Sequence, residues 1–225
     1  MGMEQEEEKW SLKAWNASLP VFNRIVEHSF IQELAHGTLD RDKFLFFTHQ
    51  DMHYLTEYGR VLGNIAVRLM QEDEIQSFMQ FAREIVGVEL KLHKKIVEEV
   101  YHDQKMPEPS PACIMYTSYL LAQLVKEPIE VALAAVLPCF WVYKEVGDHI
   151  VRIAETEDNP YRAWIDTYRD EEYTTAVQRA IEITDRYASA TTESMRERMT
   201  QAFLYSTKME WIFWDTAYRK ESWPV

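Results

Sequence analysis

A cysteine and an aromatic hydroxyl stand one helical turn apart in the apolar segment 136–147, which reads VLPCFWVYKEVG. At about 100° per residue, Cys139 and Tyr143 lie within roughly 40° of each other on one helix face. Pro138 has no N–H to donate to Ala134, so the sequence predicts a kink just before the thiol, which could open a pocket. Taken alone, the segment is more typical of a bent core helix, because a free cysteine packs as a small apolar side chain.

Two carboxylates interrupt apolar helical stripes, where burial without a partner is costly. Asp51 precedes Tyr54 by three residues on one such stripe. Taken alone, it is more typical of a bond to a neighbouring helix than of a ligand contact. Glu210 stands in the aromatic segment 209–214, MEWIFW, either at the solvent edge of the stripe or in a functional site. Desolvation there would raise the pKa of Glu210 and suit it to donating a proton.

Two carboxylate–histidine pairs offer a rival chemistry, a two-metal site inside a helical bundle. Glu89 shares a helix face with His93, and Glu145 shares one with His149. All seven histidines lie at or before His149, so the last third of the chain adds none. The other histidines are more simply explained as surface or interhelical residues. The sequence therefore predicts no metal site and no cofactor.

Hydrophobic periodicity of about 3.6 residues predicts helices along most of the chain. The first begins near Trp10, and Pro20 interrupts or restarts it. Asp40 is the expected N-cap of a long helix to about Met70, and Ser110 that of a helix whose first residue is proline. The other expected helices cover about 30–35, 73–101, 160–168, 171–189 and 193–219, together with one that Pro128 opens and that holds Cys139.

No alternating β-branched run and no internal repeat occurs, so the sequence predicts an all-α protein. A chain of 225 residues can bury roughly 70–75% of its extended surface without disulfide bonds. Because the composition does not shift, we expect a single domain over residues 9–225. The acidic residues 1–8 are expected to be disordered, and the one clear loop is 107–111, PEPSP.

The net charge of −13 disfavours binding to nucleic-acid phosphates, and the densest basic patch, 91–95, is followed by two glutamates. No apolar run approaches 18 residues, so we expect no membrane-spanning segment. The acidic first residues lack the pattern of a signal peptide. Cys113 and Cys139 have neither metal-site nor disulfide-framework spacing. A reducing, cytoplasmic location is therefore expected.

Four motifs resemble those of the TenA family of thiaminase II, in the order found in that family. They are 47–55 (FTHQDMHYL), 116–120 (YTSYL), 137–147 (LPCFWVYKEVG) and 210–214 (EWIFW). The ending AYRKESW is similar to that family's C-terminus as well. The similarity runs from about residue 10 to the end, and the cysteine after Leu-Pro marks the cysteine-containing branch.

The resemblance implies a haem-oxygenase-like helical bundle that binds no haem and assembles as a homotetramer. It also implies an enzyme of thiamin salvage that converts thiamin, or its breakdown product 4-amino-5-aminomethyl-2-methylpyrimidine, to 4-amino-5-hydroxymethyl-2-methylpyrimidine. Carried over motif by motif, Cys139 is the nucleophile, Glu210 the acid/base group and Asp51 the hydrogen-bond partner of the aminopyrimidine. The side chains expected to line the site or stack on the ring are Tyr54, Tyr116, Tyr143, Tyr168 and Phe213.

In the implied reaction the Cys139 thiolate adds to the unsubstituted ring carbon while Glu210 protonates a ring nitrogen. The group on the exocyclic methylene then leaves, water takes its place, and the thiol is released. One alternative is a di-metal oxidase of the same fold, which metal analysis would identify. The other is a non-catalytic pyrimidine-binding or regulatory protein, which would bind the ring without turnover.

Overall fold

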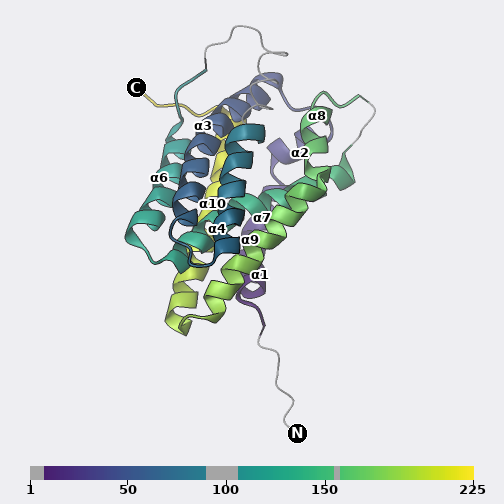
Figure 1. The fold of residues 1–225 in the computed structure, drawn as a ribbon. Coiled ribbons are helices and arrows are strands. Elements are labelled where there is room, and N and C mark those ends of the chain that lie inside the picture. The colour runs from purple at the N-terminus through teal and green to yellow at the C-terminus, as the bar shows by residue number, and fades with distance from the viewer. Residues whose placement is uncertain (1–7, 90–105, 155–157) are drawn as a thin grey trace.

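The computed structural model describes residues 8–89, 106–154 and 158–225 (Figure 1). Within these ranges every element is a helix, which confirms the predicted all-α class. The elements are α1 (Trp10–Val26), α2 (Ser29–Ala35), α3 (Arg41–Ala66), α4 (Glu72–Glu84), the π-helix η1 (Ile85–Glu89), α6 (Pro111–Lys126), α7 (Ile129–Ile153), α8 (Arg162–Ile165), the 3₁₀-helix η2 (Asp166–Arg169), α9 (Glu171–Ser189) and α10 (Glu193–Arg219). Among the described helices, none combines the length and the hydropathy needed to cross a membrane.

Side-chain caps begin the helices where the sequence predicts them. Asp40 accepts hydrogen bonds from two backbone N–H groups in the first turn of α3, at 2.8 and 3.3 Å. Ser110 and Thr192 each accept one from the backbone N–H three residues on, at 3.2 and 3.3 Å. Gly37 has φ of +71° just after α2, a left-handed conformation that glycine adopts without strain. These contacts satisfy N–H groups that a helix cannot satisfy internally.

The two prolines inside helices do not end them. The predicted interruption at Pro20 is wrong, because α1 continues through it to Val26. Pro20 and Asn16, four residues earlier, both lie on the exposed side of α1, where water can bond the carbonyl that lacks a donor. α7 likewise runs through Pro138. There the residues from Val131 to Pro138 are buried, so packing holds the turn together.

Three predicted helices have other boundaries or character. α3 ends at Ala66 rather than near Met70. The helix expected over 73–101 is α-helical only to Glu84 and continues as η1, while residues 90–101 and most of the expected disordered segment lie outside the described residues. A Cβ on Gly59 of α3 would lie 2.7 Å from Cγ2 of Val86, so glycine lets α3 and η1 approach closely. The short helix expected over 160–168 is divided into α8 and η2.

α3, α6, α7 and α10 pack against one another at the centre of the bundle (Figure 1). The indole of Trp214 in α10 is fully buried and stacks on Phe47 of α3 at 4.7 Å between ring centroids. Phe30 and Trp164 contact the same indole at 5.2 and 6.4 Å. Truncating a buried ring of this kind to alanine costs about 3–5 kcal/mol, so this cluster fixes α2, α3 and α8 against α10.

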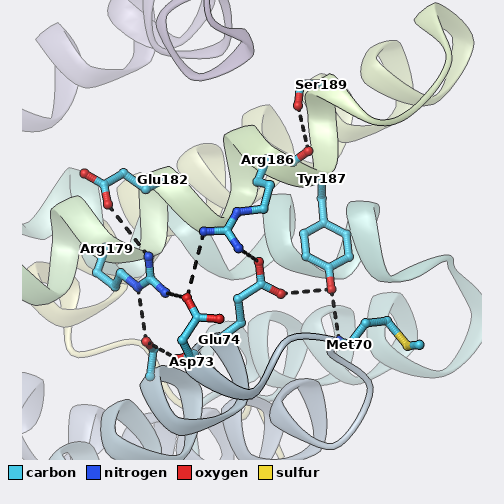
Figure 2. Close-up of polar contacts among 9 residues, drawn as sticks. Met70, Asp73, Glu74, Arg179, Glu182, Arg186, Tyr187 and Ser189 are labelled. Carbon is cyan, nitrogen blue, oxygen red and sulfur yellow. Dashed lines mark hydrogen bonds and ion pairs between the residues drawn. The ribbon is translucent and has the colours of Figure 1, made fainter.

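An ion-pair network joins the start of α4 to α9 (Figure 2). Arg179 Nη2 lies 2.5 Å from Asp73 Oδ2, and Arg186 Nη1 lies 2.9 Å from Glu74 Oε1. The Tyr187 hydroxyl donates to Glu74 Oε2 at 3.2 Å. The network holds together two helices that both line a cavity.

Candidate active site

A cavity of about 760 Å³ lies among α3, α4, η1, α7, η2 and α9, within the usual size range of small-molecule sites. Three of the predicted site residues border it, namely Asp51 from α3 and Cys139 and Tyr143 from α7. The other buried or half-buried lining side chains include Leu55, Tyr58, Phe81, Ile85, Phe140, Trp164 and Tyr173.

α7 presents the thiol and the phenol to the same space because they stand one turn apart. Cys139 is half-buried, so a ligand in the cavity can reach the sulfur. Asp51 is only 6% exposed, and α3 directs its carboxylate into the same cavity. An ionised carboxylate accepts hydrogen bonds, which matches a ligand that carries amino groups or ring N–H groups. The cavity therefore combines a nucleophile with an acceptor.

The outer part of the cavity differs from the inner part in carrying charged side chains of both signs. They come from α4, from η2 and from the start of α9, and they are Arg83, Glu84, Asp166, Arg169, Asp170 and Glu172. The entrance is therefore polar, while the inner wall beside Cys139 is mostly aromatic.

Glu210 of α10 lies outside the cavity lining and accepts a hydrogen bond from the Tyr116 hydroxyl at 2.6 Å. It is 1% exposed. Burial raises the pKa of Glu210 to about 8, the Tyr116 hydrogen bond opposes that rise, and the charge of Asp51 adds to it. Glu210 therefore holds a proton at neutral pH and can act as a general acid.

An aromatic layer connects the thiol to this carboxyl group. Tyr54 packs against Tyr116 and Phe213, with ring centroids 4.9 and 5.7 Å apart. The pKa of Tyr54 is raised well above its ordinary value, first by burial and then by the neighbouring Cys139, Tyr116 and Glu210. Tyr54 thus adjoins both reactive groups. The structure brings all these predicted residues into one region, although only Cys139 among these five borders the cavity.

Comparison with known sequences decides the family. Residues 15–220 match the TENA/THI-4/PQQC family, which covers most of the chain. The chain belongs to this family. The four motifs that resemble TenA all lie within the matched residues.

Relatives of this TenA-family chain include two proteins named aminopyrimidine aminohydrolase. The one from Helicobacter pylori is 30% identical over 203 residues, which cover 88% of this chain and 94% of that protein. The one from Bacillus subtilis is 31% identical over 199 residues, covering 87% and 84%. A thiamine biosynthesis multifunctional protein, ThiED, from Corynebacterium efficiens is 31% identical over 92% of this chain, which spans 28% of that larger protein.

Solved structures place the TenA-family fold in a wider class. A TenA homologue from P. horikoshii OT3 superposes with a TM-score of 0.83 at 29% identity, over 94% of this chain and 99% of its own. A domain with a heme oxygenase-like fold from Shewanella denitrificans superposes with a TM-score of 0.76 at 13% identity, over 93% and 92%. The second likeness concerns the fold alone, and it confirms the predicted haem-oxygenase-like bundle.

Two further residues, Tyr168 and Cys113, contribute no described side chain to this TenA-family cavity. The backbone of Tyr168 belongs to η2, and its side chain lies outside the described residues. Cys113 is 1% exposed and does not border the cavity. Burial, with smaller effects of Asp51 and Glu57, raises the pKa of the Cys113 thiol to about 12. A thiol with so high a pKa is a poor nucleophile, which fits the absence of Cys113 from the motifs.

The carboxylate–histidine pairs can be followed only in part. In the described residues, no group of three or more His, Cys, Asp or Glu side chains is arranged to hold a metal ion. Glu145 accepts from an indole N–H at 3.3 Å, and His149 Nε2 lies 3.5 Å from the side-chain amide of Gln32. His93 and the side chain of Glu89 lie outside the described residues. The absence of a metal site stays a prediction.

The site prediction did not include five aromatic residues of the TenA-family cavity, which are Tyr58, Phe81, Phe140, Trp164 and Tyr173. Tyr58, seven residues after Asp51, shares its helix face, so spacing could have identified it. Trp164 lies in α8 and Tyr173 in α9, far along the chain from Cys139. No periodicity within one helix connects them to α7, because only tertiary packing brings these helices together.

Proposed function

We propose that this protein is an aminopyrimidine aminohydrolase of the thiaminase II type that acts in thiamin salvage. It converts 4-amino-5-aminomethyl-2-methylpyrimidine, and thiamin, to 4-amino-5-hydroxymethyl-2-methylpyrimidine. The observation that carries the proposal is the cavity that Cys139 shares with Asp51, beside a buried Glu210 that keeps its proton at neutral pH. The names of the Helicobacter and Bacillus relatives support the same activity.

The first proposed step is covalent. The thiolate of Cys139 forms a carbon–sulfur bond to the unsubstituted carbon of the pyrimidine ring, and the displaced electron pair moves to a ring nitrogen. Glu210 gives its proton to that nitrogen. The adduct has lost the ring's aromaticity, so its electrons can expel the group on the exocyclic methylene. An aminomethyl substrate in its ammonium form releases ammonia, and thiamin releases its thiazole.

The second step restores the ring and the enzyme. Water adds to the methylene carbon, leaving its hydroxyl there and giving up a proton. The released ammonia takes that proton, or, when thiamin is the substrate, solvent takes it. The ring nitrogen returns its proton to Glu210, the carbon–sulfur bond breaks, and Cys139 leaves as the thiolate. The net reaction exchanges the leaving group for a hydroxyl from water, with Cys139 and Glu210 regenerated.

Binding of the ring is assigned to other residues. Asp51 accepts hydrogen bonds from the amino group of the pyrimidine, and its burial makes such a bond stronger than in water. The aromatic residues proposed to line the site or stack on the ring are Tyr54, Tyr116, Tyr143, Tyr168 and Phe213. Because these contacts do not involve the thiol, binding and chemistry can be separated by mutation.

Replacing the thiol tests this proposal. Cys139→Ser keeps the size of the side chain but replaces a thiol of pKa about 8.5 with a far weaker nucleophile. Turnover should be abolished, while ligand affinity measured by calorimetry stays within about threefold, since the ring contacts remain. Cys113→Ser is the matched control and should leave turnover unchanged. Substantial turnover by Cys139→Ser, or a folded but inactive Cys113→Ser protein, would show that Cys139 is not the catalytic thiol.

The two rival functions make different predictions for the same preparations. The proposed steps use no Lewis acid, so turnover should survive exhaustive chelation, whereas a di-metal oxidase would lose activity and regain it with added iron or manganese. A non-catalytic pyrimidine-binding protein would bind the ring and release no hydroxymethyl product.

We also propose a homotetramer of single-domain chains that functions in the cytoplasm. One shared hydrophobic core extends from α1 to α10, which supports a single TenA-like domain over residues 9–225. An apolar face of α6 leaves Ile114, Met115, Leu121 and Val125 exposed, and such a face suits an interface between chains. Both cysteines are free thiols, as in a reducing compartment. Light scattering that finds a monomer at micromolar concentrations would contradict the tetramer.

A further inference from the structure

Two tyrosine hydroxyls from different helices bond the backbone of α7 on either side of Cys139. The hydroxyl of Tyr58 in α3 donates to the carbonyl oxygen of Val136 at 2.9 Å. The hydroxyl of Tyr173 in α9 donates to the carbonyl oxygen of Phe140 at 3.0 Å. The two bonded carbonyls thus belong to residues three before and one after the cysteine.

The turn that leads to the thiol lacks one of the backbone hydrogen bonds of α7. Pro138 has no N–H, so the carbonyl of Ala134 loses its partner in the helix, and the proline ring crowds it. Helices with an internal proline bend or open at that turn unless other contacts hold it. The bonds from Tyr58 and Tyr173 reach α7 at this turn and tie it to the helices on its two sides.

The surroundings of Tyr58 keep its hydroxyl in the donating form. Tyr58 is 1% exposed, and its ring stacks on Tyr54 with centroids 5.5 Å apart. Burial raises the pKa of Tyr58 well above its ordinary value, and the nearby Cys139 and Tyr116 raise it further. The phenol therefore stays protonated at any pH at which the protein would function. Tyr173 is half-buried and borders the cavity from α9.

We propose that Tyr58 and Tyr173 are positioning residues that clamp the Cys139 turn of α7, a role that rests on the proposed covalent function of the thiol. Addition of sulfur to a ring carbon requires the two atoms to be held about 3–3.5 Å apart, and a misplacement of 1 Å can cost about 100-fold in rate. The clamp fixes how far the thiol projects into the cavity. It leaves ring binding to Asp51 and the other aromatic residues.

The test uses Tyr58→Phe and Tyr173→Phe in the full chain, with Cys113→Ser as background so that Cys139 is the one remaining thiol. Each variant keeps its ring and loses one hydroxyl. Each should lower kcat by about 10-fold, and the double variant by about 100-fold, while KM for the aminomethylpyrimidine stays within about threefold. Alkylation of Cys139 by iodoacetamide in Tyr173→Phe should stay within about threefold, because a small reagent needs no positioning. Tyr58 also forms a side-chain hydrogen bond with Cys139, so Tyr173→Phe is the variant used for this measurement.

The matched control is Tyr187→Phe, on the same helix as Tyr173. Its hydroxyl bonds Glu74 and the backbone N–H of Met70 in the α4–α9 network, and it does not border the cavity (Figure 2). The kcat of Tyr187→Phe should stay within about twofold of that of the unchanged protein. This should hold even if its Tm falls by as much as the Tm of the test variants. If Tyr58→Phe does not fold, the half-buried Tyr173→Phe provides the same test.

Three outcomes would overturn the clamp. They are an unchanged kcat in both test variants, an equal loss of kcat in Tyr187→Phe, or a fall in alkylation as large as the fall in kcat. The last would mean that the hydroxyls set the reactivity of the thiol rather than its position. Failure of the proposed function looks different, because then the unchanged protein gives no product or Cys139→Ser retains turnover.

Discussion

Among the residues that the structure describes, two glutamates are buried, and they have different partners. Glu210 is 1% exposed and its hydrogen-bond partner is the neutral hydroxyl of Tyr116 at 2.6 Å. Glu74 is fully buried, and it accepts a similar hydrogen bond from Tyr187 at 3.2 Å. Glu74 differs in that the guanidinium of Arg186 lies 2.9 Å from its second oxygen (Figure 2).

The comparison shows that a cation, rather than burial or a phenol, distinguishes the two carboxyl groups. A guanidinium beside Glu74 offsets the cost of burying a negative charge, so that glutamate contributes to the connection between α4 and α9. Glu210 has only a phenol to stabilise its charge and Asp51 to oppose it, so its pKa rises to about 8. A structural carboxylate and a proton donor therefore share one residue type and one degree of burial.

Replacing each glutamate by glutamine should separate these roles most clearly. Glu210→Gln cannot exchange a proton and should lose about 10²–10⁴ in kcat. Glu74→Gln keeps an acceptor for the Tyr187 hydroxyl and loses the ion pair with Arg186, so its kcat should stay within about twofold while its unfolding free energy falls by about 1–2 kcal/mol. Steady-state kinetics and urea unfolding of both variants measure this. Comparable losses of kcat in Glu210→Gln and Glu74→Gln would show that the two glutamates do not differ in catalytic role.

Removing the cation should convert Glu74 into an unfavourable buried charge. Arg186→Gln leaves the Glu74 carboxylate without its guanidinium and should destabilise the protein by about 3 kcal/mol. Adding Glu74→Gln should recover part of that loss, because no uncompensated charge then stays buried. Urea denaturation of the two single variants and the double variant gives the coupling energy. Additive losses would show that the pair does not act as a unit.

The sequence predicted the fold well where local chemistry determines the helix. Asp40, Ser110 and Thr192 cap the helices that their positions indicated, and α9 and α10 have the predicted bounds. The prediction was wrong at Pro20, which α1 contains without ending, because the carbonyl that loses its donor lies on the exposed side of the helix, where water can bond it. No clear sequence pattern indicates that α4 continues as the π-helix η1. The one local signal is the glycine at position 87.

The candidate site was predictable where a spacing within one helix carries it. Cys139 and Tyr143 share a face of α7, and the cavity contains both. The carboxyl group of Glu210 could be singled out by its aromatic neighbours, but not its bond to Tyr116, which joins residues 94 positions apart. Tyr173 was missed for the same reason, since its contact with α7 arises only when α9 packs there.

The raised pKa of Glu210 also predicts how stability depends on pH. Its folded-state pKa of about 8 lies above the ordinary 4.5, so the folded state holds an extra proton between these values. The stabilisation is complete below 4.5 and is lost as pH rises to about 8, by about 1.4 kcal/mol per pH unit. The unfolding free energies of the unchanged protein and of Glu210→Gln can be measured in urea at pH 5 to 8. The difference between them should narrow or reverse as the pH rises. Parallel curves would contradict the assigned proton.

The smallest expected effect concerns the tyrosine hydroxyl that donates to each glutamate, Tyr116 to Glu210 and Tyr187 to Glu74. The hydrogen bond from Tyr116 lowers the pKa of Glu210, opposing its burial. Tyr116→Phe keeps the ring and should therefore move the high-pH fall of kcat/KM upward, by less than about one pH unit. Tyr187→Phe removes the corresponding hydroxyl from Glu74 and should leave that fall where it is. A pH–rate profile of the three proteins decides this. A downward shift in Tyr116→Phe, or an equal shift in Tyr187→Phe, would mean that another group sets the profile.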